Sequence, residues 1–109
     1  VSGKWRRNGY PAFLSRTLHI SFITELELLG FQGIRKEDIP FIKDFLDSCI
    51  IVDLNQSIKR ITINLKQSYK IKLPDAIIAA TSVYMNLPLI SADKDFDHID
   101  DLKFIRYEV

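Results

Sequence analysis

Short apolar runs rich in β-branched residues alternate along this chain with longer amphipathic segments. This rhythm is typical of parallel strands joined by crossover helices. Four runs fit buried strands: residues 18–23, 50–53, 89–91 and 104–107. Four stretches with helical periodicity lie between these runs: residues 24–31, 36–48, 55–69 and 75–85. The pattern predicts an α/β protein with a parallel sheet, and a structure with an antiparallel sandwich or an all-helical bundle would contradict this prediction.

Local signals indicate where several of the helices begin. Thr24 and Glu27 have the spacing of a capping box, which predicts a helix start at Thr24. Asn55 can cap the following helix, and Pro74 opens the last one. That last helix is rich in alanine, so we expect it to pack closely on the sheet. Residues 1–17 fit the rhythm poorly, although a helix is conceivable over residues 11–18.

Length, charge and cysteine content set limits on the type of protein. A chain of 109 residues suffices for one domain. Its 15 basic and 14 acidic residues give no overall signal for nucleic-acid binding, yet a local basic patch fits within that balance. The single cysteine, Cys49, allows no internal disulfide and favours a cytoplasmic protein, and its apolar neighbours predict a small buried side chain. No apolar run reaches the ~18 residues that a membrane span requires.

Carboxylates follow two of the predicted strands and open one of the predicted helices. Glu25 and Glu27 come after the first strand, and Asp93 and Asp95 come after the strand at residues 89–91. Asp75 stands at the start of the alanine-rich helix. Ligands of open α/β sheets bind beyond the carboxyl ends of the strands, and acids gathered there repel one another unless a cation neutralises them. Oxygen ligands suit Mg²⁺ or Mn²⁺, which promote phosphodiester cleavage.

Each of these acids also has a purely local explanation. Glu27 can close the capping box, and Asp75 can favour the positive end of a helix. Asp93 and Asp95 can shape a turn. Taken alone, the residues support only an α/β domain with an acidic rim.

Three segments together resemble the PIN-domain family, and most closely its VapC-type toxins. Residues 20–30 are similar to the segment after the family's second strand, residues 73–81 to its third acidic segment and residues 87–96 to its fourth. The resemblance runs from about residue 14 to residue 109. It implies a three-layer fold with a central, mostly parallel sheet and helices on both faces. It also implies a single domain over residues 1–109, in which residues 1–17 are atypical.

The resemblance implies specific roles for the acids. Glu27, Asp75 and Asp93 would be the catalytic, metal-binding residues, and Asp95 would be an additional metal ligand. Ser91 stands where the family often has a threonine that orients the last acid. We expect the carboxylates of Glu27, Asp75 and Asp93 to converge to within roughly 4–8 Å of one another, as shared metal ions ~4 Å apart require.

The function implied by the resemblance is that of an endoribonuclease dependent on Mg²⁺ (or Mn²⁺), the toxin of a type II toxin–antitoxin system. The implied partners are an RNA substrate, a cognate antitoxin and a second copy of the chain in a homodimer, without a membrane. The alternative is a non-catalytic, PIN-like remnant that acts as a dimer or partner-binding module.

The chain departs from the family at its beginning. PIN domains start with a strand that ends in aspartate, usually followed by threonine and asparagine, but no aspartate precedes Asp38. The family's first strand and first acid are therefore expected to be missing, as in a truncated chain. Because divalent binding grows with the charge and rigidity of the ligands, three of the four acids predict weak Mg²⁺ binding and poor RNA cleavage.

Other polar residues give weaker signals. Neither His19 nor His98 stands in a zinc-ligand spacing, and His19 suits a packing or edge position. Lys94, beside Asp93, is the best single candidate for a phosphate contact. The other basic residues could contact RNA or simply form solvated surfaces, and Trp5 and Tyr10 could stack on bases. The basic residues in question are Arg6, Arg7, Arg16, Lys59, Arg60, Lys66, Lys70 and Lys72.

Overall fold

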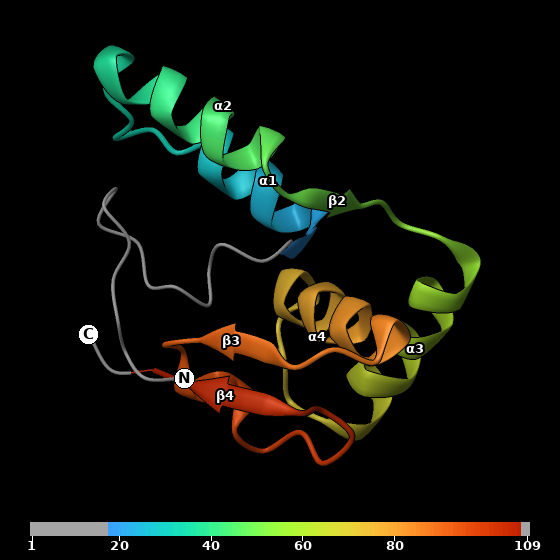
Figure 1. The fold of residues 1–109 in the computed structure, drawn as a ribbon. Coiled ribbons are helices and arrows are strands. Elements are labelled where there is room, and N and C mark those ends of the chain that lie inside the picture. The colour runs from blue at the N-terminus through green and yellow to red at the C-terminus, as the bar shows by residue number, and fades with distance from the viewer. Residues whose placement is uncertain (1–17, 108–109) are drawn as a thin grey trace, which may run out of the picture. The chain divides into compact units, whose positions relative to one another are not determined.

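The computed structural model describes residues 18–107 (Figure 1). Its contacts divide the chain into two units, Val1–Val52 and Asp53–Val109. The helix considered at residues 11–18 falls almost wholly outside the described residues. The roles considered for Trp5 and Tyr10, and for the arginines among residues 1–17, fall outside them as well. Each unit is described separately below.

The first unit contains one parallel strand pair and the helices that connect its strands. Strand β1 (His19–Ser21) pairs with β2 (Ile50–Val52), and the register places His19 opposite Ile50. Helix α1 (Phe22–Leu29), the short 3-10 helix η2 (Lys36–Asp38) and α2 (Ile39–Asp47) form the crossover. Parallel strands need such a long connection, because the chain must return to the end at which the first strand began before it can form the second. The prediction of strands in both places is confirmed, each somewhat shorter than expected.

Helix α1 begins earlier than the capping box predicted. The N-cap is Ser21, the last residue of β1, whose side-chain oxygen accepts a hydrogen bond of 3.2 Å from the backbone N–H of Ile23. The prediction that the helix starts at Thr24 is therefore wrong. A buried serine at the strand end already supplies the acceptor that a helix start needs, so Thr24 lies inside the first turn. Glu27 is consequently an exposed residue of the helix body and closes no capping box.

Cys49 lies between α2 and β2. Its side chain is half-buried, and its thiol donates a hydrogen bond of 3.3 Å to the carbonyl of Phe45. Burial raises the pKa of the Cys49 thiol, so the reactive thiolate is disfavoured. These features agree with the packing role predicted for this residue, although its burial is only partial.

The second unit contains two helices followed by a second parallel strand pair. Helix α3 (Gln56–Ser68) leads to α4 (Leu73–Met85) and then to β3 (Leu89–Ser91). A 3-10 helix, η3 (Lys94–Phe96), precedes β4 (Phe104–Arg106). Strands β3 and β4 are parallel, with Leu89 opposite Phe104 and Ser91 opposite Arg106. The two strands predicted here are confirmed.

The ends of α3 and α4 follow local sequence signals. The Asn55 side chain accepts a hydrogen bond of 2.8 Å from the N–H of Ile58, which confirms the predicted cap of α3. Pro74 occupies the first turn of α4, where its missing N–H costs no hydrogen bond. Asn86 ends α4 in the left-handed conformation, with φ of 54°. Asparagine tolerates that conformation better than most residues, so the helix stops there.

The core of the second unit forms where α3 and α4 pack against each other (Figure 1). Ile58 on α3 is fully buried, as are three alanines of α4: Ala76, Ala79 and Ala80. Small side chains allow two helix backbones to approach closely, which explains the alanine-rich sequence. The prediction placed this helix on the sheet, and its most extensive packing is with α3. The remaining buried apolar residues of the unit are Leu65, Ile71, Phe96, Ile99 and Leu102.

The α/β class with parallel strand pairing is confirmed. All four described strands pair in parallel, as β1 with β2 and as β3 with β4. Among residues 18–107, no helix is both long enough and apolar enough to cross a membrane.

Candidate metal site

Three aspartates of the second unit come together beside the end of β3. They are Asp75 in the first turn of α4, Asp93 just after β3 and Asp95 in η3. Each offers a carboxylate oxygen, and these oxygens lie within 4.8 Å of one another. Asp75 is half-buried, whereas Asp93 and Asp95 are exposed. Within the part of the chain that the structure describes, this is the one acidic, histidine or cysteine cluster compact enough for a metal ion.

Hydrogen bonds along the segment after β3 hold two of these acids in place. The Ser91 side-chain oxygen accepts a hydrogen bond of 3.1 Å from the N–H of Asp93. The Asp93 carboxylate in turn accepts one of 2.9 Å from the N–H of Asp95. The local, turn-forming role considered for Asp93 is therefore real. It leaves acceptor positions free on the Asp93 carboxylate, because an ionised carboxylate offers about four.

The cluster has the chemistry of a site for a hard divalent cation. Its donors are carboxylate oxygens, which suit Mg²⁺ and Mn²⁺ better than soft metals. Oxygens on opposite sides of a bound Mg²⁺ lie about 4.2 Å apart, so a separation within 4.8 Å needs little adjustment. Burial raises the pKa of Asp75, and the carboxylates of Asp93 and Asp95 raise it further, while Lys72 lowers it. A cation would relieve the repulsion that this raised pKa records.

The raised pKa of Asp75 predicts a pH-dependent stability difference. An acid with a higher pKa in the folded state binds its proton more readily there than in the unfolded chain. Stability therefore falls as pH rises from the ordinary value of 3.8 through the raised pKa. In EDTA, we expect Asp75→Asn to be more stable than the parent chain at about pH 7 and to lose this advantage by about pH 3. Thermal unfolding of both proteins at the two pH values measures the effect, and a variant less stable than the parent at neutral pH would contradict it.

The structure brings together three of the four acids that the resemblance singled out. Asp95, expected only as an additional ligand, belongs to the same cluster as Asp75 and Asp93. Glu27 lies on α1 in the first unit, so its convergence with the aspartates remains a prediction. Glu25, in the first turn of α1, is partly exposed.

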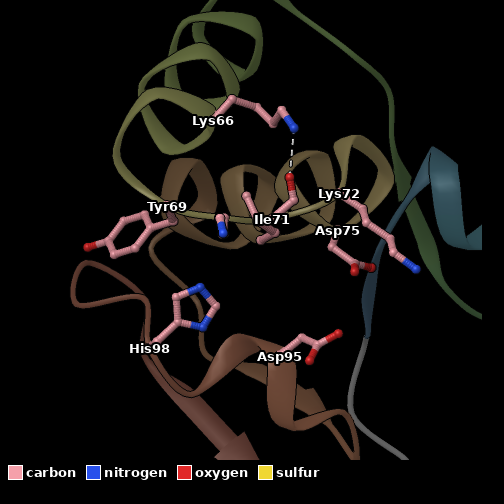
Figure 2. Close-up of a pocket in the computed structure, with 8 residues that line it drawn as sticks. Lys66, Tyr69, Ile71, Lys72, Asp75, Asp95 and His98 are labelled. Atoms are coloured by element: carbon pink, nitrogen blue, oxygen red, sulfur yellow. Dashed lines mark hydrogen bonds between the residues drawn. The ribbon is translucent and has the colours of Figure 1, made fainter.

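A pocket of about 530 Å³ adjoins two of the clustered acids (Figure 2). Its lining comes from the end of α3, the α3–α4 connection, the start of α4 and the segment after β3. The lining residues are Lys66, Tyr69, Lys70, Ile71, Lys72, Asp75, Asp95 and His98. In the sequence, Lys66, Lys70 and Lys72 are not distinguishable from the other basic residues that could contact RNA. The sequence signal that could have indicated the pocket is the Lys-Ile-Lys pattern at residues 70–72, in which a lysine flanks the isoleucine on each side.

One side of the pocket is aromatic. The rings of Tyr69 and His98 meet edge to face, with centroids 5.5 Å apart and planes 70° apart. The Tyr69 hydroxyl oxygen also accepts a hydrogen bond of 3.2 Å from the N–H of Asp100. The His98 ring lies between the Tyr69 ring and the two carboxylates (Figure 2). His98 is thus part of a wall, and His19 lies exposed on β1, so neither belongs to a metal cluster among residues 18–107.

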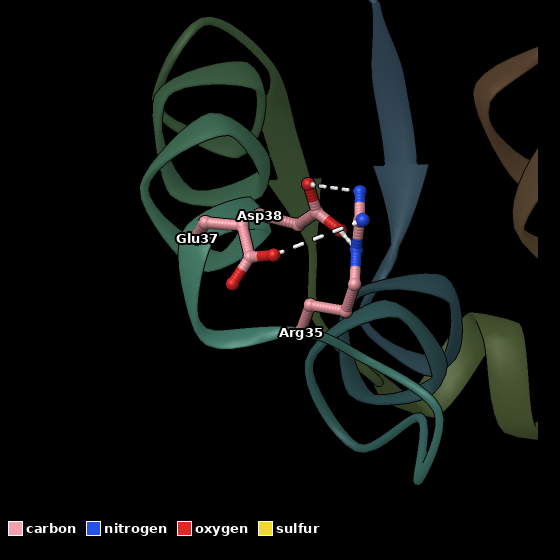
Figure 3. A network of polar contacts seen from close by, with 3 residues as sticks. All are labelled: Arg35, Glu37 and Asp38. Carbon is pink, nitrogen blue, oxygen red and sulfur yellow. Dashed lines mark hydrogen bonds and ion pairs between the residues drawn. The ribbon is translucent and has the colours of Figure 1, made fainter.

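Two of the described arginines, Arg35 and Arg106, form ion pairs with residues outside the pocket. Arg35 donates hydrogen bonds of 2.9 and 3.3 Å to the carboxylate of Asp38 and lies 3.7 Å from Glu37 (Figure 3). This exposed network joins the turns just before α2 and contributes at most about 1 kcal/mol per pair. Arg106 pairs with Asp97 at 2.9 Å. Such pairs leave the arginine charges partly compensated, in contrast to the lysines at the pocket.

Comparisons with known proteins identify relatives of the chain. The PIN domain family matches residues 5–102. A toxin–antitoxin complex from Klebsiella pneumoniae contains a chain 34% identical, with a TM-score of 0.69, and the match covers 82% of this chain and 73% of that one. No curated protein is similar enough to count as a relative.

Two further solved structures have a similar fold. One is VapBC2 from Rickettsia felis, bound to a DNA fragment from its promoter. It is 24% identical, with a TM-score of 0.65, and the match covers 84% of this chain and 76% of that one. The other is VapBC-5 from Mycobacterium tuberculosis: 22% identity, 78% and 76% of the two chains, and a TM-score of 0.56. At these identities the likeness concerns the fold.

Proposed function

The chain belongs to the PIN-domain family, and from this premise we propose that it is a divalent-metal-dependent endoribonuclease, the toxin of a type II toxin–antitoxin system. The observation that carries the proposal is the meeting of Asp75, Asp93 and Asp95, with carboxylate oxygens within 4.8 Å. An oxygen-only ligand set beside a strand end is what a phosphodiesterase of this family needs.

We propose that Asp75 and Asp93 hold Mg²⁺ or Mn²⁺ together with Glu27, and that Asp95 is a further ligand. The ion would supply an activated water and charge stabilisation for phosphodiester hydrolysis. Ser91 acts as a positioning residue, since its hydroxyl oxygen holds the backbone of Asp93. The turn from Asp93 to Asp95 then fixes the spacing of two carboxylates before any ion arrives. This preorganisation reduces the cost of bringing like charges together.

The proposed protein partner is an antitoxin, with a second copy of the chain forming a homodimer. The Klebsiella pneumoniae relative is a toxin–antitoxin complex, which supports the first of these. Large apolar side chains in the first unit are well exposed: Leu26 at 58%, Phe31 at 64% and Phe41 at 73%. Leu26 and Phe41 belong to helices α1 and α2, which contact each other, so we propose that they contribute to an apolar patch of the kind that commonly marks a protein-binding surface. We also propose that the two units form one domain, because the family match spans both, and that the protein is cytoplasmic, as its single cysteine suggests.

The second candidate is a non-catalytic PIN-like module that binds a partner. The observation that favours it is the exposure of large apolar side chains in the first unit, such as Phe31 and Phe41. In that case the acidic cluster would be a remnant, and the exposed apolar residues of the first unit would carry the function.

Incubation of the pure protein with single-stranded RNA distinguishes these two functions. We expect slow cleavage that requires Mg²⁺ or Mn²⁺ and stops in EDTA, because a site with fewer acids holds its ion weakly. Gel analysis of end-labelled RNA over time measures the rate, and Mn²⁺ should also raise the unfolding temperature by mass action. RNA that stays intact at every metal concentration, with no metal-dependent thermal shift, would favour the non-catalytic module.

A further inference from the structure

We propose that the pocket beside the acidic cluster is a subsite for one nucleotide of single-stranded RNA, in which Lys70 and Lys72 bind its phosphate and His98 contacts its base. This inference rests on the proposed ribonuclease function. It assigns the residues that bind the RNA next to the cleaved phosphodiester bond. The pocket's volume of about 530 Å³ falls within the range of about 300–1,000 Å³ usual for small-molecule sites.

The backbone between α3 and α4 places the two lysines on one side. This connection is extended at both ends, since Tyr69 has φ −134° and ψ 151° and Lys72 has φ −69° and ψ 151°. Side chains alternate along an extended chain, so Ile71 points one way and its two neighbours point the other. Ile71 is buried, at 7% exposure, and Lys70 and Lys72 are exposed. Burial of one isoleucine therefore leaves both neighbouring lysines exposed at the pocket, with the Lys72 side chain extending past Asp75 (Figure 2).

A hydrogen bond from a lysine side chain to the backbone holds the α3–α4 connection in place. The Lys66 ammonium, on the last turn of α3, donates a hydrogen bond of 2.7 Å to the carbonyl of Ile71 (Figure 2). Lys66 thus acts as a positioning residue, and its charge is engaged with the backbone. The solvated-surface interpretation of Lys66 is incomplete for that reason. Lys70 and Lys72 remain as the pocket's available cations.

Within residues 18–107, neither Lys70 nor Lys72 forms an ion pair, because the pairs found there involve only Arg35 and Arg106. Lys72 still acts on Asp75 at longer range, since it lowers the pKa of that acid. The two ammonium groups, in a pocket that also contains Asp75 and Asp95, give it both signs of charge. An RNA strand needs this combination, because the acids that hold a metal ion repel the phosphates that flank the cleaved one. Nearby lysines compensate that repulsion.

The aromatic wall supplies a surface for the base. The Tyr69 ring supports His98 edge to face, and the Tyr69 hydroxyl oxygen is itself anchored by the N–H of Asp100. His98 is exposed, so its imidazole is accessible to a ligand. Unpaired bases stack on aromatic and histidine rings, whereas bases within a duplex have their faces covered. The arrangement therefore favours single-stranded RNA over a duplex.

Binding of a fluorescent single-stranded RNA in EDTA tests the subsite separately from catalysis, because no hydrolysis occurs without metal. Anisotropy titrations at several salt concentrations compare the parent chain with Lys70→Gln/Lys72→Gln and with His98→Ala. The matched control is Lys59→Gln/Arg60→Gln, which removes two adjacent exposed cations of α3 outside the pocket. Circular dichroism confirms that each variant is folded.

We expect the pocket double variant to bind at least about tenfold more weakly. The slope of log affinity against log salt concentration should become shallower by about 0.7, the contribution of one phosphate contact on a single strand. His98→Ala should weaken binding about fivefold with an unchanged salt dependence, as loss of a base contact predicts. The control should change affinity less than about twofold. Equal losses in pocket and control variants would overturn the subsite, while metal-dependent cleavage by the parent would leave the ribonuclease function standing. A parent chain that neither binds nor cleaves RNA would overturn both.

Discussion

Replacement of Asp75 by Asn is expected to slow metal-dependent RNA cleavage at least about 100-fold, because even residues that only orient metal ligands alter affinity or activity by about 10–100-fold. Asp75 is central to the cluster, since it is the half-buried member, and burial followed by the charges of Asp93 and Asp95 raises its pKa. An amide of the same shape removes the negative charge and one oxygen donor. A site in which ions share ligands suffers most from such a loss.

The measurement is the initial rate of cleavage of end-labelled RNA at saturating Mn²⁺ or Mg²⁺. Asp101→Asn is the matched control, because Asp101 is an exposed aspartate of the same unit that lies outside the cluster. The variant should also lose the thermal shift that Mn²⁺ causes in the parent chain, while its stability in EDTA at neutral pH increases. Unchanged cleavage in Asp75→Asn would show that another group of acids carries the reaction.

The sequence predicted the parallel α/β class because short apolar runs alternate with helical stretches. The runs at residues 50–53 and 89–91 each became a strand within one residue of the expected bounds. The expectation that these strands are buried is wrong, since every residue of β2 and β3 is at least partly exposed. The residues at which helices and strands begin and end depend on individual hydrogen bonds. The hydrophobic pattern of the sequence predicts these boundaries less well than it predicts the elements themselves. Ser21 illustrates this, since a serine inside the expected strand was the true helix cap. Asn55 was correctly predicted because it directly follows a strand and precedes an apolar helical stripe.

The candidate site was only partly accessible from sequence. Asp75 and Asp93 were selected by the family resemblance, and spacing alone could not have separated them from turn-forming acids. Asp95 was expected only as an additional ligand, and the structure places it in the same cluster, where its N–H donates a hydrogen bond to the Asp93 side chain. Lys70 and Lys72 were named as possible RNA contacts but were not distinguished from the other basic residues, since their place at the pocket depends on the tertiary structure. Contacts distant in sequence, such as that of Tyr69 with His98, leave no local signal at all.

The largest effect on stability is expected from Ile58→Ala, which should lower the free energy of unfolding by about 4 kcal/mol, within the usual range of about 2–5 kcal/mol for a buried isoleucine. Ile58 is fully buried at 0% exposure, on the α3 face of a core whose α4 side is formed by alanines. Alanines offer no long side chains that could move into the space left by the isoleucine, so the cavity should persist. Such a loss would remove much of the total stability of a chain this size, which is roughly 5–15 kcal/mol for most proteins.

The matched control for this prediction is Ile63→Ala on the same helix. Ile63 is 57% exposed, so its replacement removes little buried surface and gains about 0.5 kcal/mol or less of helix propensity. Urea unfolding followed by circular dichroism gives both free energies, and equal slopes in the two variants would show that the extent of unfolding is unchanged. A loss below about 1 kcal/mol in Ile58→Ala, or similar losses in both variants, would mean that α3 and α4 do not form the core that the structure describes.

Ile58→Ala also serves as a reference for the Asp75→Asn experiment, because a protein that is only destabilised loses activity as well. Cleavage should recover in Ile58→Ala when the temperature is lowered. It should not recover in Asp75→Asn, because that variant lacks a metal-binding carboxylate.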